Sequence, residues 1–158
     1  WNMVQFIVNP IGKVKISRAG MLIEIDHKYR PALKELDGFS HVNVICWFDG
    51  SDNEEMRNVL EVAAPYKKGP QAMGIFATRS PVRPNPIALS TVQILYIDYE
   101  EGVVGIAYID ADDGTPVIDL KPYTPSLDRV ESPGVPKWCS HWPNSLEESA
   151  HFNWENEF

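Results

Sequence analysis

Short apolar segments separated by glycine, proline or charged turns constrain the fold of this chain more than any other feature. Strand patterns occur in VQFIV (4–8), KVKIS (13–17), MLIEID (21–26), HVNVICWF (41–48), GIFATR (74–79), IALSTVQILYID (87–98), VVGIAYID (103–110) and DGTPVIDLKPY (113–123). No glycine-rich turn joins a strand to a helix, so a dinucleotide-binding α/β fold is not predicted. The pattern instead predicts a mainly β protein, in which a small antiparallel sheet is closed or nearly closed into a barrel.

Two segments have helical character. YRPALKELDGF (29–39) predicts one or two helical turns, with Pro31 near the start, where its missing N–H is tolerated. SDNEEMRNVLEVAA (51–64) is the strongest helix prediction, because a polar cap and an acidic first turn precede apolar residues at i, i+4 spacing. We therefore expect one or two short helices beside the barrel.

Length and cysteine content indicate the type of protein. A chain of 158 residues is long enough for one domain with a real core. Its two cysteines, Cys46 and Cys139, are too few for a disulfide framework. No run approaches the roughly 18 apolar residues of a membrane span. The sequence thus predicts a cytoplasmic protein with no membrane partner.

Charge is distributed unevenly. The formal net charge of −8 argues against broad non-specific binding to nucleic acid. Residues 62–97, however, contain no Asp or Glu, whereas residues 138–158 contain no Lys or Arg. The basic residues of the first window are Lys67, Lys68, Arg79 and Arg83. A local positive region on an acidic protein is therefore expected.

The segment TRSPVRPNP (78–86) joins two apolar stretches through three prolines. Each proline fixes φ and pushes the preceding residue toward extended geometry, so the segment should be a stiff surface loop. One interpretation is that the loop preorganises Arg79 and Arg83 for a carboxylate or phosphate. The other is a rigid connection whose arginines pair with surface acids. Composition alone leaves both open.

Longer sequence motifs in the chain resemble those of a known family. MGIFATRSPVRPNPIALS (73–90), followed by DADDGTPVIDLKPY (110–123), closely resembles the TrmO (TsaA-like, YaeB-like) family of S-adenosylmethionine-dependent methyltransferases. NPIGKV (9–14) and LDGFSHVNVICWF (36–48) also resemble family segments. The resemblance implies a methyltransferase barrel domain at residues 3–137 and an acidic, aromatic tail at 138–158 packed on the barrel.

The resemblance further implies a homodimer that binds S-adenosylmethionine near the subunit interface. Characterised members methylate the exocyclic amine of a threonylcarbamoyl-modified adenosine beside the tRNA anticodon. The positions that match cofactor-contacting residues are Asp49, Gly50, Phe76, Arg79, Arg83, Asn85, Leu89, Ala107, Tyr108, Ile109 and Asp110.

The residue types at these positions suit the cofactor. Arg79 can pair with the donor's carboxylate, Asp49 or Asp110 can bind its ammonium or hydroxyls, and Leu89 with Ile109 can form apolar walls for the adenine. A general base would assist methyl transfer to nitrogen. Its candidates are Asp110, Asp113, Asp119, Lys121 and Tyr123. Acids around a glycine turn can equally be hydrogen-bonded turn formers, so the residues do not identify a base.

Departures from the family pattern bear on the acceptor. The chain lacks the R-x-P-G-L element of bacterial tRNA enzymes, Ala88 replaces a usual glycine, and Asp49 stands where histidine is common. A small-molecule acceptor, or a non-catalytic module that binds S-adenosylmethionine, therefore remains an alternative to tRNA. Cys139 and His141 lack a second ligand pair, so no metal site is predicted.

Overall fold

The computed structural model describes residues 3–158, which divide into two compact units. The barrel unit comprises residues 3–52 and 85–129, and the second unit comprises residues 53–84 and 130–158. Each unit is built from two stretches of chain, so the polypeptide leaves the barrel after Asp52 and returns at Asn85.

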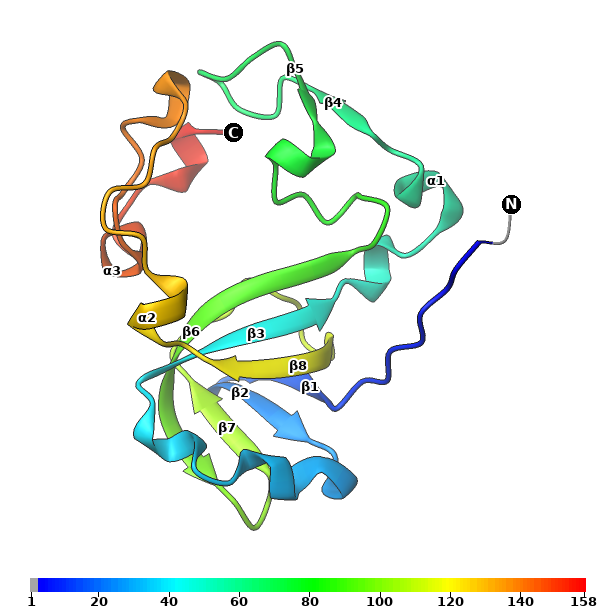
Figure 1. Cartoon of the computed structure of the whole chain (residues 1–158), viewed down its shortest axis with the longest axis vertical. Coiled ribbons are helices and arrows are strands. Elements are labelled where there is room, and N and C mark those ends of the chain that lie inside the picture. The colour runs from blue at the N-terminus through cyan, green and yellow to red at the C-terminus, as the bar shows by residue number, and fades with distance from the viewer. Residues whose placement is uncertain (1–2) are drawn as a thin grey trace. The chain divides into compact units, whose positions relative to one another are not determined.

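Six antiparallel strands close the barrel, as Figure 1 shows. They are β1 (Gly12–Ser17), β2 (Gly20–Ile25), β3 (His41–Trp47), β6 (Ile87–Asp98), β7 (Val103–Ile106) and β8 (Pro116–Pro122). Their order around the ring is β1-β2-β7-β6-β3-β8, and β1 pairs with β8 to complete it. This confirms the expected mainly β fold with a closed antiparallel barrel.

Aliphatic side chains fill the barrel. Along β3, buried Val42, Val44 and Cys46 alternate with partly exposed residues, as expected for a strand with one face in the core. The other buried members of the core are Val14, Ile23, Ile25, Leu33, Leu36, Val92, Val104, Ile106, Ile109 and Val117. Burial of these side chains supplies the main stabilisation of this unit.

The hairpin between β6 and β7 turns at Gly102, which has a φ of 69°. Glycine suits this backbone conformation, and a Cβ here would lie 2.6 Å from Arg30 Nε, so the arginine side chain would have to move. Arg30 Nη1 also donates a hydrogen bond to the carbonyl of Glu100, at 2.8 Å. The turn and the segment carrying Arg30 are thus fixed together.

Only short helices accompany the barrel. The 3₁₀ helices are His27–Leu33, Leu36–Gly38 and Asp49–Ser51, and one α-helical turn, α2, covers Pro125–Asp128. Helical turns were predicted within residues 29–39, and the two 3₁₀ helices in this region confirm that prediction. Asp128 closes α2 by accepting hydrogen bonds from the Thr124 N–H and from Asn43 Nδ2 on β3.

The second unit has little regular structure. Its elements are α1 (Glu54–Arg57), β4 (Glu61–Ala63), β5 (Ala72–Gly74), α3 (Leu146–Ser149) and the 3₁₀ helices Ile75–Ala77, Lys137–Cys139 and Trp154–Asn156. β4 and β5 form a two-stranded antiparallel sheet. Packing of side chains from loops must therefore stabilise most of this unit.

Aromatic rings gather in the second unit. Tyr66 stacks on Trp138 with ring centroids 5.1 Å apart, and it also contacts Trp142 and Phe158. Trp142 continues the cluster to Trp154 at 5.3 Å. The tail beyond residue 138 is thereby packed on the loop around Tyr66.

A buried carboxylate lies within this cluster. Glu157 is 4% exposed and accepts hydrogen bonds from Trp142 Nε1 at 3.0 Å and from His141 Nε2 at 2.9 Å. The bonds from Trp142 and then His141 hold the pKa of Glu157 below its usual value, because both stabilise the charged form. The Lys67 N–H also donates to the Glu157 carbonyl at 2.8 Å, which ties the tail to the loop before β5.

Several predicted elements differ from the structure. The helix expected over 51–64 is wrong beyond one turn: α1 begins after Asn53, whose side chain caps the Met56 N–H, and the chain then pairs as β4. Pairing with β5 overrides helix propensity here. In addition, the expected strand at 74–79 is mostly a 3₁₀ turn, residues 4–8 form no strand, and β7 ends at Ile106 rather than 110.

Two sequence predictions about organisation remain predictions. The boundary expected between a domain at 3–137 and a tail at 138–158 is one, and the cytoplasmic location is the other. Across residues 3–158, no helix is both long and apolar enough to cross a membrane.

Candidate functional site

Local hydrogen bonds stiffen the proline segment of the second unit. Thr78 is buried, and its hydroxyl donates to the Ile75 carbonyl at 2.8 Å and accepts from the Ser80 N–H at 3.3 Å. Arg83 Nη1 then bridges two carbonyls of the same segment, Thr78 O at 3.2 Å and Ser80 O at 3.1 Å. The prolines and these bonds together give a preformed loop, as the sequence predicted.

The two arginines of this loop have different environments. Arg83 is partly buried, and its hydrogen bonds go to backbone carbonyls, so it supports the loop rather than pairing with surface acids. Arg79 is exposed, and so is the Phe76 ring, at 81%. Arg79 and Phe76 are thus exposed members of the predicted cofactor set in the second unit.

On the barrel unit, Leu89 lies on β6, and Asp49 and Gly50 follow the neighbouring strand β3. Asp49 and Gly50 begin the 3₁₀ turn directly after β3, and Leu89 on β6 pairs with Ile45 of β3. The Phe48 N–H donates to the Pro86 carbonyl at 2.7 Å, which holds the end of β3 beside the residues around Asn85. The sheet register therefore brings Asp49, Gly50, Asn85 and Leu89 to one region.

The segment Ala107–Asp110 borders the opposite edge of β6. After β7 ends, the Ala107 N–H donates to the Gln93 carbonyl on β6 at 3.0 Å, and the Ile109 N–H donates to Met21 Sδ at 3.4 Å. Tyr108 and Asp110 are exposed, whereas the Ile109 side chain is 2% exposed and belongs to the core. Ile109 cannot form the expected apolar wall with its side chain, so any ligand contact at this residue must use its backbone.

The glycine turn after this segment is tied to β1. Ile16 N–H donates to Asp113 Oδ1 at 2.8 Å across 97 residues of sequence, and Gly114 N–H donates to the Val14 carbonyl at the same distance. The Thr115 hydroxyl closes the turn on the Asp112 carbonyl at 2.7 Å. Asp113 therefore positions the segment that carries Asp110.

The five candidates for a catalytic acid or base are engaged to different extents. Asp113 is committed to β1, Asp119 pairs with Lys121 at 3.1 Å, and the Tyr123 ring packs edge-on against His41. Across residues 3–158, no hydrogen bond or ion pair engages the carboxylate of Asp110, which is exposed. Asp110 is thus the acid that is available to a ligand.

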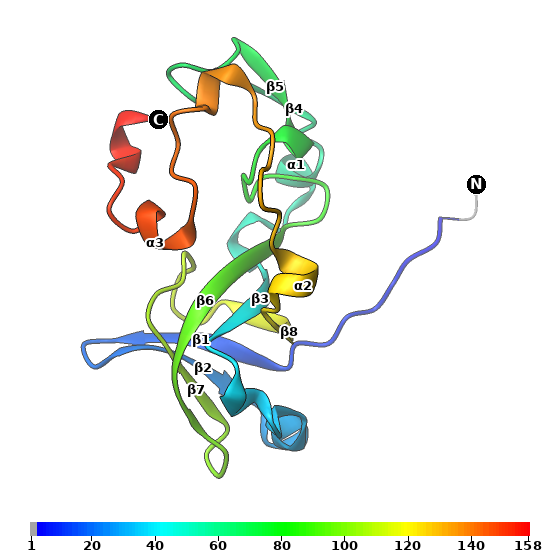
Figure 2. The same cartoon turned by 60° about the vertical axis from the view of Figure 1, so that its left-hand side comes forward.

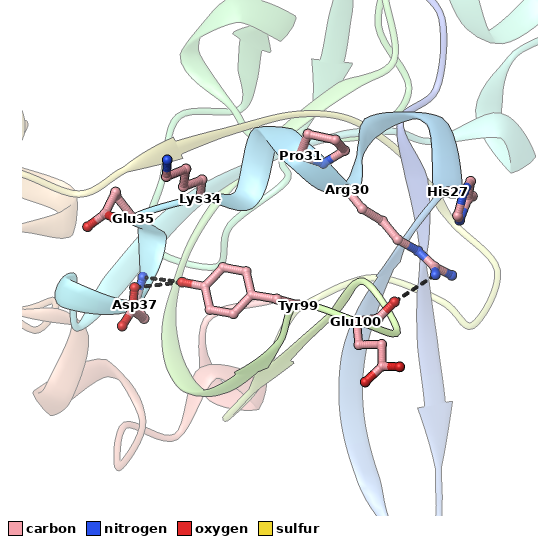
Figure 3. A pocket seen from close by; sticks show the side chains of 8 residues that line it. All are labelled: His27, Arg30, Pro31, Lys34, Glu35, Asp37, Tyr99 and Glu100. Atoms are coloured by element: carbon pink, nitrogen blue, oxygen red, sulfur yellow. Dashed lines mark hydrogen bonds between the residues drawn. The ribbon is translucent and has the colours of Figure 1, made fainter.

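A surface depression of the barrel unit lies elsewhere, between the 3₁₀ helix His27–Leu33 and the β6–β7 hairpin (Figure 3). Its volume is about 630 Å³, and it is lined by His27, Arg30, Pro31, Lys34, Glu35, Asp37, Tyr99 and Glu100. Tyr99 donates a 2.6 Å hydrogen bond to Asp37, which raises the pKa of the tyrosine hydroxyl. None of the predicted site residues lines this depression.

Cysteine and metal chemistry find little support in the described residues. Cys46 is buried in the core, and burial raises the pKa of its thiol to about 11, so it is a poor nucleophile. Cys139 donates to the Pro136 carbonyl, and His141 is bonded to Glu157. Within residues 3–158, no group of three or more His, Cys, Asp or Glu side chains is arranged to hold a metal ion.

Comparison with known proteins connects these segments to a family. Residues 8–129 match the family model described as the tRNA-methyltransferase O N-terminal domain. The chain belongs to the TrmO family. The match includes β1, β3, the proline segment, β6 and the Ala107–Asp110 segment, so every predicted cofactor position lies inside it.

Individual TrmO relatives and structures agree with this assignment. A protein of Archaeoglobus fulgidus named "S-adenosyl-L-methionine-binding protein" is 35% identical over 138 residues, covering 78% of this chain and 94% of that protein. A crystal structure of TrmO from Pseudomonas aeruginosa superposes with a TM-score of 0.64 at 26% identity, covering 85% of this chain.

The TrmO match does not extend over the full length of all relatives. This chain covers 62% of the Pseudomonas aeruginosa TrmO chain. Another Archaeoglobus fulgidus relative is 37% identical over 116 residues, which are 73% of this chain and 30% of that protein.

Sequence reasoning missed two features of the site. It did not foresee that Arg83 would bond to the Thr78 and Ser80 carbonyls, or that Asp113 would be held by Ile16. The close spacing of serine, threonine and arginine in TRSPVR was the available signal for the first. The bond between Ile16 and Asp113 depends on how β1 lies beside the turn before β8, and no local sequence pattern predicts this.

Proposed function

We propose that this chain is an S-adenosylmethionine-dependent methyltransferase, and that its acceptor is the N6 amine of a threonylcarbamoyl-modified adenosine beside the tRNA anticodon. The family match over residues 8–129 carries the proposal. The match spans both the stiff loop with Arg79 and the barrel residues around Asp49, Leu89 and Asp110.

The residues present suit the cofactor. On the barrel, the half-exposed Leu89 supplies apolar surface, and the exposed carboxylates of Asp49 and Asp110 suit ribose hydroxyls, an ammonium group or the sulfonium charge. On the loop, the guanidinium of Arg79 suits a carboxylate, and the Phe76 ring offers a face for stacking. When bound, S-adenosylmethionine supplies an electrophilic methyl group.

The chain's own contribution is mainly positioning. The preformed loop presents Arg79 with little ordering cost, because the Thr78 and Arg83 hydrogen bonds already fix its backbone. Asp113 anchors the turn next to Asp110, whose free carboxylate can accept the proton that the acceptor amine releases. Asp110 is thus the proposed base, and Asp113 is a positioning residue.

The first experiment offers labelled S-adenosylmethionine with two forms of the same tRNA, one carrying threonylcarbamoyladenosine and one transcribed without modifications. Label should enter only the modified tRNA, and nucleoside analysis should place it on N6. At saturating donor, Asp110→Asn should lower the rate of labelling by about 10²–10⁴-fold. Asp112→Asn is the matched control, because its side chain is exposed nearby and its structural bond uses the backbone carbonyl.

Donor binding is tested separately by calorimetry. Arg79→Ala should weaken binding of S-adenosylmethionine by about 1.5–3 kcal/mol, the range for a hydrogen bond to a charged group. Arg18→Ala, an exposed arginine outside the predicted set, should leave the affinity unchanged. Equal affinities for both variants would exclude Arg79 as the carboxylate partner.

A second candidate acceptor is a small molecule, with the same methyl donor. The formal net charge of −8 favours it, because an acidic surface repels tRNA phosphates. A metabolite extract assayed in parallel distinguishes the two. Label in the extract and none in tRNA would support the small-molecule acceptor, and donor binding without any labelled product would support a non-catalytic binding module.

A further inference from the structure

The surface depression between the 3₁₀ helix His27–Leu33 and the β6–β7 hairpin has no part in the proposed methyl transfer; we call it the hairpin pocket. The helix and the hairpin lie at the same end of the barrel unit, as Figure 1 and Figure 2 show. Leu89 is near the start of the 12-residue strand β6, whereas Tyr99 follows its end. The pocket volume of about 630 Å³ is within the range of small-molecule sites.

Charged side chains line the hairpin pocket without neutralising one another. Basic and acidic side chains occur in equal number, and they are His27, Arg30, Lys34, Glu35, Asp37 and Glu100. Within residues 3–158, no ion pair joins any two of these six side chains. A ligand that carries both a negative group and hydrogen-bond donors can therefore bind to both sets at once.

Arg30 and His27 form the positive end of the pocket. Arg30 Nη1 donates to the Glu100 carbonyl at 2.8 Å, so the β6–β7 turn holds the guanidinium in place. Among the residues described, Arg30 Nη2 and the His27 imidazole make no hydrogen bond. Figure 3 shows both side chains on the same side of the Tyr99 ring. Two sets of free N–H donors at one end suit a phosphate group.

Glu35 and Asp37 form the acidic end, on the other side of the Tyr99 ring (Figure 3). The hydrogen bond to Asp37 is the main cause of the raised pKa of Tyr99, and the charge of Glu35 is a further cause, so both carboxylates lie near the hydroxyl. In the described part of the chain, the Glu35 carboxylate has no hydrogen bond or ion pair. Its φ of 68° is uncommon for glutamate, and such backbone strain is concentrated at ligand sites.

The Tyr99 ring offers a flat surface between these two ends. It is 42% exposed, although its hydroxyl is bonded to Asp37. Aromatic side chains in such positions stack on planar heterocycles, as they do on the bases of nucleic acids. The pocket thus combines a positive end, a stacking surface and an acidic end.

The order of these three features selects the class of ligand. The ammonium and carboxylate of a simple amino acid share one carbon atom, so they do not span the Tyr99 ring. A nucleotide carries its phosphate at one end and the hydrogen-bonding edge of its base at the other. Guanine alone among the common bases offers two adjacent donors, N1–H and N2–H, to one carboxylate. Adenine and cytosine place a ring-nitrogen acceptor beside their amine, and a carboxylate repels it.

We propose that the hairpin pocket binds a guanine nucleotide, either free or as part of an RNA chain. The base stacks on Tyr99 and donates from N1 and N2 to Glu35, while the 5′-phosphate accepts hydrogen bonds from Arg30 and His27. None of these residues belongs to the predicted cofactor or catalytic set. The inference is therefore independent of the proposed methyl transfer.

Calorimetric titration of the 158-residue chain with guanosine 5′-monophosphate tests the inference first. We expect binding with a Kd of about 1 mM or tighter. Inosine 5′-monophosphate, which lacks the N2 amine, and guanosine, which lacks the phosphate, should each bind at least about 10-fold more weakly. No binding of guanosine 5′-monophosphate at about 10 mM would overturn the inference. Equal affinities for this nucleotide and either analogue would overturn it too.

Two variants then assign each end of the ligand. Glu35→Gln should remove most of the preference for guanosine 5′-monophosphate over its inosine analogue, and Arg30→Gln should remove most of the preference over guanosine. Each result is a ratio of two affinities, so a general loss of stability cannot imitate it. The matched controls are Glu101→Gln and Lys28→Gln, exposed neighbours that do not line the pocket. Ratios in the test variants equal to those of the controls would contradict the assigned contacts.

A pair of substitutions at Tyr99 tests the stacking surface. Tyr99→Leu and Tyr99→Phe both lose the hydrogen bond to Asp37, but only the first loses the aromatic ring. Tyr99→Leu should therefore weaken binding of guanosine 5′-monophosphate by about 5- to 100-fold, whereas Tyr99→Phe should bind as the wild-type chain does. The same affinity in both variants would exclude stacking on this ring.

A short single-stranded RNA with one guanosine between uridines distinguishes the two sources of the nucleotide. Tighter binding of this RNA than of guanosine 5′-monophosphate, with a loss in Glu35→Gln, would assign the pocket to RNA. Equal or tighter binding of the mononucleotide would assign it to free nucleotides. An all-uridine RNA is the control, and its binding as tightly as the guanosine-containing RNA, together with equal binding of the guanine and inosine nucleotides, would overturn guanine recognition.

Discussion

In the barrel unit, aliphatic side chains meet inside a closed ring of hydrogen-bonded strands, whereas the second unit packs aromatic rings around a buried carboxylate. The barrel is held by interactions that depend little on pH or on the exact shape of each side chain. The second unit depends on a few specific rings and two hydrogen bonds to Glu157. The comparison teaches that one short chain can combine a robust scaffold with a region that tolerates far fewer changes.

A cavity in the barrel core should lower the stability of the protein more than any other change considered. Ile23→Ala removes a fully buried side chain and should lower the free energy of unfolding by about 2–5 kcal/mol, through lost burial and the cavity left behind. Urea unfolding followed by far-ultraviolet circular dichroism measures this change. Leu127→Ala, at an 88% exposed position, should change the free energy by less than about 0.5 kcal/mol.

Removal of the central ring of the second unit should have a smaller effect. Tyr66→Leu keeps an apolar side chain but loses ring contacts with Trp138, Trp142 and Phe158, each worth about 0.5–1.5 kcal/mol beyond burial. We expect a loss of about 1–3 kcal/mol, seen by tryptophan fluorescence. The barrel's unfolding, followed by circular dichroism, should keep its wild-type free energy. If that free energy fell by the same amount, the two units would unfold as one cooperative unit, and their different packing would not give them separate stabilities.

Lowering the pH should affect the second unit before the barrel, with the smallest loss of stability of the three predictions. Because the folded pKa of Glu157 lies below its ordinary value of 4.5, its contribution is complete above that pH and is lost as pH falls through the folded pKa. The tail fluorescence should therefore respond below about pH 4.5, before the barrel's circular dichroism does.

Glu157→Gln is the control for that titration. The amide cannot be protonated in this range, so the acid response of the tail should flatten. An unchanged response in this variant would assign the effect to other carboxyl groups of the acidic tail, such as Glu148 or Glu155.

The contrast also explains how much could be predicted. The positions of the barrel strands followed from periodicity, as with IALSTVQILYID, which forms β6 over the same residues, although β7 is shorter than predicted. The helix expected over 51–64 failed because β4 pairs with β5, an interaction between segments that propensity does not contain. The aromatic cluster and the buried Glu157 were not predicted, since which rings meet depends on how irregular loops pack.

The candidate site, too, could be predicted only in part. Sequence motifs that resemble the family located Arg79, Asp49, Leu89 and Asp110, and the chemistry of each residue suggested its role. Only the structure showed that Ile109 is in the core and that Asp113 is bonded to β1. Burial and register decide which side chains reach a ligand, and both are properties of the closed barrel.

The pairing of β1 with β8, the seam that closes the barrel, affects how the chain folds. Gly12 pairs with Val117, so the ring cannot close during synthesis until Val117 has left the ribosome. Such distant pairings slow folding, because the entropy of a long loop must be lost before the contact forms. Ile16 and Asp113 meet across the same seam, so the segment next to Asp110 is held in place by a contact between residues 97 positions apart in the sequence.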